Sequence, residues 1–135
     1  MMDYLLDVNV LMAWGWADHP GHLRTAGWIA QSRQQGGNRL FTSAMPELGF
    51  VRVSVQRTAG RVTVAAAASV LHGMLQTLGP AHTFLPDDLP SSCSWPPWCA
   101  AAARTTDAHL LELARRHHLA LATLDEGIPG AFLIP

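Results

Sequence analysis

The sequence predicts an α/β fold, because short apolar runs of strand length alternate with longer segments that have helical spacing. The chain has 135 residues, of which 49% are hydrophobic and 14% are charged, and this size and composition suit one domain with a substantial core. No internal repeat is visible in it. We therefore expect a single domain over residues 1–135, with a sheet of parallel strands packed between helices.

The first part of the chain contains two predicted strands and three predicted helices. The strands are residues 4–8 and 39–42, and the helices are residues 9–17, 22–35 and 43–56. The first helix stops near His19-Pro20, because proline interrupts a helix, and the second ends at Gly36-Gly37. The third has apolar side chains at helical spacing, which outweighs its β-branched residues.

The remaining part contains three predicted strands and two predicted helices. The strands are residues 82–85, 119–124 and 131–134, and the helices are residues 63–78 and 106–118. The first of these helices is rich in alanine and closes at Gly79-Pro80, and the second has arginines and histidines in its last turns, where they complement the helix dipole. Four prolines predict an irregular loop over residues 86–98.

Charge and composition exclude several classes of function. The formal net charge of −1 means that no overall basic field attracts nucleic acid, so a polyanion would need a local arginine patch or a bound metal. All nine basic residues are arginine, which excludes lysine-dependent phosphate loops and Schiff bases. Two cysteines are too few for a disulfide framework or a four-ligand zinc site. No apolar run approaches membrane-spanning length, so we expect a cytoplasmic protein without a membrane segment.

Four acidic residues occupy positions that favour a shared site. Asp7 lies at the end of an apolar strand just before a helix, and Asp125 follows another apolar strand. Asp107 begins a helix, and Glu47 lies in the first turn of another. If the strands are parallel, all four can converge at the carboxyl edge of the sheet, where ligands bind in open α/β folds. Each residue alone also has an ordinary explanation, since an acid at a helix start commonly caps the helix or interacts with its dipole.

Clustering of these carboxylates would favour a metal ion. Close carboxylates repel one another in a site of low dielectric unless a cation neutralises them, and hard oxygen ligands suit Mg²⁺ or Mn²⁺ rather than zinc. One or two such ions can activate water and stabilise both oxygens of an in-line displacement at phosphorus. The sequence therefore predicts phosphodiester hydrolysis.

Four segments of the sequence form a distinctive set: LLDVNVL (residues 5–11), PELGFVR (46–52), TDAHLLELA (106–114) and LATLD (121–125). In this order and spacing they resemble the conserved blocks of PIN-domain ribonucleases, and most closely those of VapC toxins from type II toxin–antitoxin pairs. The resemblance assigns Asp7, Glu47, Asp107 and Asp125 to the acidic quartet that binds metal, and it assigns Asn9 and Thr123 to polar positions beside it. The segment 91–103 does not match the family pattern, and we interpret it as a variable loop.

The resemblance also implies fold, activity and partners. It implies a three-layer α/β/α sandwich with a parallel sheet of four or five strands and an endoribonuclease activity that depends on Mg²⁺ or Mn²⁺. It further implies a homodimer, a VapB-like antitoxin that inhibits the activity, and structured RNA such as tRNA or rRNA as the substrate.

Two arginines and one histidine are candidates for RNA contact. Arg52 lies on the predicted helix that carries Glu47, Arg57 follows at the end of that helix, and His109 is two residues beyond Asp107. A solvent-exposed arginine without a role in RNA binding is the ordinary alternative for Arg52 and Arg57.

Two other functions stay open for the protein: a PIN scaffold that has lost catalysis and serves as a binding module, and a metal-dependent nuclease or phosphatase with a different substrate.

Overall fold

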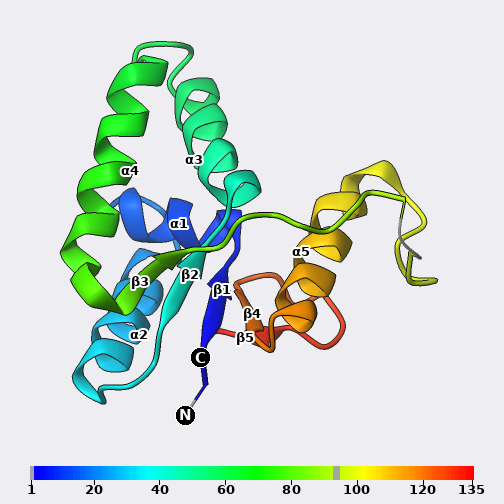
Figure 1. Ribbon diagram of the computed structural model, residues 1–135. Coiled ribbons are helices and arrows are strands. Elements are labelled where there is room, and N and C mark those ends of the chain that lie inside the picture. Colours follow the sequence, from blue (N-terminus) through cyan, green and yellow to red (C-terminus); the bar gives the residue numbers. More distant parts are fainter. Residues whose placement is uncertain (1, 93–94) are drawn as a thin grey trace.

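The computed structural model describes residues 2–92 and 95–135, and within them five α-helices surround a five-stranded sheet (Figure 1). The strands are β1 (Tyr4–Leu6), β2 (Leu40–Thr42), β3 (His82–Phe84), β4 (Ala120–Thr123) and β5 (Phe132–Leu133). The helices are α1 (Val8–Gly15), α2 (His22–Gln34), α3 (Ala44–Arg57), α4 (Val64–Leu78) and α5 (Thr105–Arg116). Short 3₁₀ turns, η1 (Gly79–Ala81) and η2 (Ala102–Arg104), precede β3 and α5.

All neighbouring strands of the sheet are parallel, in the order β3-β2-β1-β4-β5. In the register of the central strands, Leu5 of β1 lies opposite Phe41 of β2 on one side and Leu121 of β4 on the other. The predicted α/β class with a parallel sheet is therefore confirmed. Because the strands are parallel, the residues that follow β1, β2 and β4 meet at one edge of the sheet.

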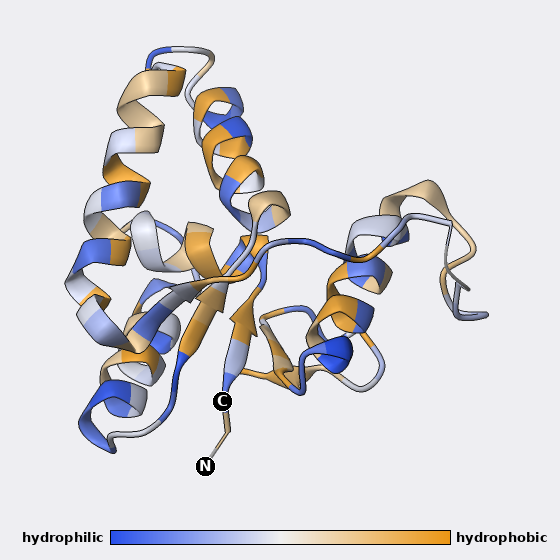
Figure 2. Ribbon diagram, in the orientation of Figure 1, coloured by the Kyte–Doolittle hydropathy of each residue, from blue (hydrophilic) through white to orange (hydrophobic). Residues whose placement is uncertain are grey.

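Helices cover both faces of the sheet, which makes three layers (Figure 1). Side chains alternate along each strand, so Leu5 and Leu121 pack in the cluster with α5, whereas Leu6 and Ala122 pack in the cluster with α1 to α4. Figure 2 shows that the central strands are largely hydrophobic, as expected for strands buried on both faces. The α/β/α sandwich implied by the family resemblance is confirmed.

The chain between β3 and η2 contains no helix or strand in the part that the structure describes, as its prolines predict. Two carboxylate–imidazole pairs attach this segment to α5 and to the residue that follows it. His109 Nε2 lies 2.6 Å from an oxygen of Asp87, and His117 Nε2 lies 2.9 Å from an oxygen of Asp88. Among the described residues, no helix combines the length and apolar character that a bilayer crossing requires.

Candidate active site

Asp7 lies at the point where the buried strand β1 passes into α1. It is the N-cap of α1, and its Oδ1 accepts a hydrogen bond of 2.7 Å from the backbone N–H of Val8. Its Oδ2 accepts a second hydrogen bond, of 2.8 Å, from the hydroxyl of Thr123. The residue is only 4% exposed, so its charge lies in a poorly solvated environment.

Thr123, at the end of β4, connects several parts of this edge of the sheet. Its buried hydroxyl donates to Asp7 and accepts from the side-chain amide of Asn9 at 3.2 Å and from the backbone N–H of Asp125 at 3.0 Å. The Oδ1 of Asn9 in turn accepts from the backbone N–H of Leu124 at 3.1 Å. The structure thus places Asn9 and Thr123 beside Asp7, where the family resemblance puts them.

Asp107 and Asp125 lie close enough to Asp7 to affect its ionisation. Burial raises the pKa of Asp7 to about 6, with repulsion from the Asp107 and Asp125 carboxylates adding to the effect and the Thr123 and Val8 hydrogen bonds opposing it. Burial also raises the pKa of Asp107, again with a contribution from Asp125. The structure therefore places Asp7, Asp107 and Asp125 within electrostatic range of one another.

Arg104 accompanies this group of acids, although the sequence analysis did not identify it. Its guanidinium lies 3.8 Å from a carboxylate oxygen of Asp107, and this attraction opposes the rise in the pKa of Asp107. It also donates to the carbonyl of Gly127 and lies 5.2 Å from the centre of the Trp98 ring. Its position three residues before Asp107, at the N-terminus of α5, was the available sequence signal.

Glu47 is oriented differently from the other three acids. It lies in the first turn of α3, and its Oε2 accepts a hydrogen bond of 2.6 Å from Thr42 Oγ1. It borders an apolar groove of about 440 Å³ between α3 and α4, together with Leu48 and Leu71. Among residues 2–92 and 95–135, no three His, Cys, Asp or Glu side chains are grouped closely enough to hold a metal ion by themselves.

A cleft of about 530 Å³ opens beside the acids. Asp7 and Asp107 border it, and so do both arginines that the sequence predicts for RNA contact, Arg52 and Arg57. The Arg57 guanidinium also forms an ion pair of 2.9 Å with Asp18. Carboxylates and guanidinium groups therefore share one cleft, an arrangement that suits a metal ion next to a phosphodiester backbone.

His19 also borders this cleft, and no pattern in the sequence distinguishes it from the other histidines. Its Nδ1 lies 2.9 Å from the backbone nitrogen of Gly21 and accepts a hydrogen bond from it. In the neutral ring the proton is therefore on Nε2.

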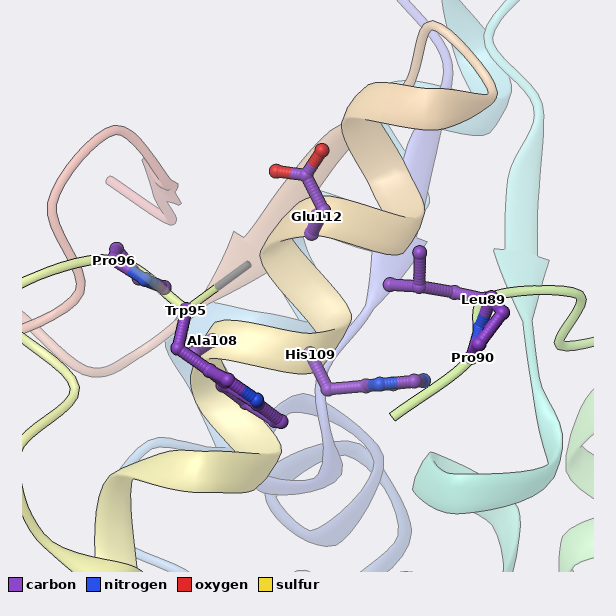
Figure 3. A pocket seen from close by; sticks show the side chains of 7 residues that line it. All are labelled: Leu89, Pro90, Trp95, Pro96, Ala108, His109 and Glu112. Carbon is purple, nitrogen blue, oxygen red and sulfur yellow. The ribbon is translucent and has the colours of Figure 1, made fainter. Parts of the chain in front are cut away.

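His109 lies on a different side of α5 from Asp107. Besides pairing with Asp87, it borders a small pocket with Trp95 and Glu112, and its ring points toward the segment that contains Leu89 and Pro90 (Figure 3). Contact between His109 and RNA stays a prediction, and it would require the RNA to extend from the cleft to this segment.

Comparison with known proteins finds relatives over nearly the whole chain in Mycobacterium tuberculosis. Ribonuclease VapC39 is 35% identical over 130 residues, which cover 94% of this chain and 91% of that protein. Ribonuclease VapC38 is 36% identical over 126 residues, with 92% and 86% covered, and Ribonuclease VapC29 is 35% identical over 127 residues, with 94% and 89% covered. No protein-family model matches the chain. On the strength of these relatives, the chain belongs to the VapC-like family of PIN-domain ribonuclease toxins.

Proposed function

We propose that this protein is a metal-dependent endoribonuclease that hydrolyses phosphodiester bonds of RNA and acts as the toxin of a toxin–antitoxin pair. The observation that carries the proposal is that Asp7 and Asp107 border one cleft with Arg52 and Arg57, while the Asp125 carboxylate is near enough to influence the ionisation of both acids. Membership in a family of ribonucleases supports RNA as the substrate.

The residues at this edge of the sheet fit Mg²⁺ or Mn²⁺. Asp7, Asp107 and Asp125 offer only oxygen donors. Burial, with a smaller contribution from repulsion by Asp107 and Asp125, raises the pKa of Asp7, and a bound cation would favour its charged form. Mg²⁺ commonly uses one or two carboxylates together with water and substrate phosphate, so it does not require three protein ligands already in place. We propose Glu47 as the fourth acid of the site. A bound ion would supply Lewis acidity and a more acidic water.

The residues of the chain have separate tasks in this proposal. Thr123 holds Asp7 in one orientation through its hydrogen bond to Oδ2, and Asn9 fixes Thr123 in turn. Arg52 and Arg57, on α3, bind backbone phosphates and so align the RNA along the cleft. These contacts are independent of base identity, so they would position the RNA without selecting its sequence.

The proposed partners follow from the family. We propose that residues 1–135 form a single PIN domain that assembles as a homodimer and is inhibited by a VapB-like antitoxin. We propose structured RNA, such as tRNA or rRNA, as the substrate. Because that substrate is cellular RNA, we also propose a cytoplasmic location.

Cleavage of total RNA by the purified protein tests the proposed activity. We expect discrete fragments with Mg²⁺ or Mn²⁺ and none with EDTA or with Asp107→Asn, which removes one site charge at nearly constant volume. Gel electrophoresis with mapping of the fragment ends measures the result. If the folded, antitoxin-free protein neither cleaves RNA nor binds Mn²⁺ at millimolar concentration, a scaffold that only binds other molecules replaces the proposal. Cleavage of DNA in preference to RNA would indicate a different nuclease.

Metal affinity should depend on pH through Asp7. Its pKa of about 6 means that the carboxylate is mostly protonated at pH 5, and a proton must leave before an ion can bind. We therefore expect the affinity for Mn²⁺, measured by calorimetry, to weaken about tenfold between pH 7 and pH 5. In the Asp7→Asn variant, this change of Mn²⁺ affinity with pH should disappear. A midpoint near pH 4 in the wild-type protein would contradict the raised pKa of Asp7.

A further inference from the structure

Thr42 and His82 form a hydrogen-bonded chain that ends on Glu47. Thr42 Oγ1 lies 2.6 Å from Glu47 Oε2 and 2.7 Å from His82 Nε2. Thr42 is the last residue of β2 and is completely buried, whereas His82 is the first residue of β3. Three elements that are separate in the sequence therefore meet at one hydroxyl group.

The strand register explains why these side chains meet. His82 pairs with Leu40 in the parallel register of β2 and β3, so its side chain lies on the same face of the sheet as those of Leu40 and Thr42. Thr42 is the diagonal neighbour two residues further along β2, within reach of a long side chain. The backbone N–H of Leu85 also donates to the Thr42 carbonyl at 2.7 Å, which ties the end of β3 to the end of β2.

The chemistry of the three groups sets the direction of the hydrogen bonds. An ionised carboxylate can only accept, so the single hydroxyl proton of Thr42 is donated to Glu47 Oε2. The Thr42 oxygen must then accept from the imidazole, which requires the proton of neutral His82 to be on Nε2. Burial lowers the pKa of His82, which favours this neutral form, while the Glu47 charge opposes the effect.

The chain constrains one oxygen of Glu47 and leaves the other available. Within residues 2–92 and 95–135, Oε2 receives the Thr42 hydrogen bond and no hydrogen bond reaches Oε1. A carboxylate held in this way has one orientation relative to α3 while it keeps a free donor atom. Neither Thr42 nor His82 belongs to the segments that carry the family resemblance.

We propose that Thr42 and His82 are positioning residues for Glu47, which hold its carboxylate through a chain that runs from His82 Nε2–H to the Thr42 hydroxyl and on to Glu47 Oε2. The inference rests on the proposed function only in giving Glu47 a role at the metal site. The hydrogen-bonded chain itself belongs to the metal-free protein and can be tested there.

The first test is the tautomer of His82 in the metal-free protein at pH 7.5, measured by ¹⁵N NMR of the imidazole nitrogens. We expect the proton on Nε2 and an unprotonated Nδ1. The Glu47 carboxyl ¹³C signal should move in Thr42→Val and His82→Phe, and it should stay in place in Thr25→Val. Thr25 is a suitable control because it is also a completely buried threonine, and it lies on α2. A proton on Nδ1, or an unmoved Glu47 signal in both variants, would overturn the inference.

The second test measures whether the hydrogen bond from Thr42 to Glu47 affects metal binding and RNA cleavage. We expect Thr42→Val to weaken the apparent affinity for Mn²⁺ about tenfold and to lower kcat with an unchanged KM for RNA, and Thr42→Ser to restore both by returning the hydroxyl. A folded Thr42→Val protein with wild-type Mn²⁺ affinity and kcat would limit Thr42 to a structural role. If the wild-type protein binds no metal and cleaves no RNA, the proposed function fails, while the NMR result still decides whether Thr42 and His82 hold Glu47.

Discussion

We expect Asp7→Asn to abolish RNA cleavage while the protein stays folded. The substitution removes a site charge at nearly constant volume, and asparagine caps a helix as well as aspartate does. Loss of residues that merely support metal ligands costs about 10–100-fold, so the cleavage rate should fall by more than about a hundredfold. Cleavage assays with Mn²⁺ and circular dichroism of the same samples measure the two effects. Full activity in a folded Asp7→Asn protein would refute the site assignment.

The same substitution should stabilise the metal-free protein at neutral pH. Because the pKa of Asp7 is raised from 3.8 to about 6 on folding, the folded state binds the proton more tightly than the unfolded state. The stabilisation from that proton is complete below pH 3.8 and is lost as pH rises through 6. The Asp7→Asn variant would not undergo this loss, so the difference in unfolding free energy should grow to about 1–3 kcal/mol by pH 7.

Thermal unfolding of both proteins in EDTA, from pH 4 to pH 7, measures this difference. The two curves of Tm against pH should diverge between pH 4 and pH 6, with the variant above the wild type. Parallel curves would show that Asp7 has an ordinary pKa in the folded protein.

We expect Thr123→Val to reduce both stability and activity. The substitution removes the hydroxyl that donates to Asp7 and accepts from Asn9 and Asp125, and it leaves these groups without partners in a buried site. Unpaired buried polar groups cost about 1–3 kcal/mol, so Tm should fall by roughly 10 °C. The cleavage rate should fall about 10–100-fold, because Asp7 loses the group that orients it.

Thr25→Val provides a matched control for Thr123→Val. Both threonines are completely buried, but among the described residues the Thr25 hydroxyl has no hydrogen-bond partner. Its replacement by valine should therefore leave cleavage unchanged and keep or slightly raise Tm. Equal losses of stability in the two variants would show that the effect at Thr123 comes from packing rather than from its hydrogen bonds.

Local patterns in the sequence were sufficient for the order and approximate limits of the strands and helices. The predicted and observed elements differ most importantly at Asp7. The predicted strand of residues 4–8 includes Asp7, whereas β1 ends at Leu6 and Asp7 caps α1. Both descriptions put the residue at the same edge of the sheet. The approach of Asp125 to Asp7 was predictable for this reason, because the ends of the parallel strands β1 and β4 converge at one edge of the sheet. Asp107 lies in the first turn of α5, the helix that precedes β4.

The sequence by itself thus determined the α/β class, the family and the edge of the sheet where the acids gather. Only the tertiary structure decided which side chains hold them. The bond from Thr123 to Asp7 joins residues 116 positions apart, and the contact from His82 to Thr42 joins residues 40 positions apart. Such contacts depend on the strand order β3-β2-β1-β4-β5 and on its register, which place distant residues side by side. The orientation of the Glu47 side chain toward Thr42 also could not be predicted from the sequence pattern. The spacing of residues along a helix predicts which face a side chain lies on, but it does not predict its hydrogen-bond partner.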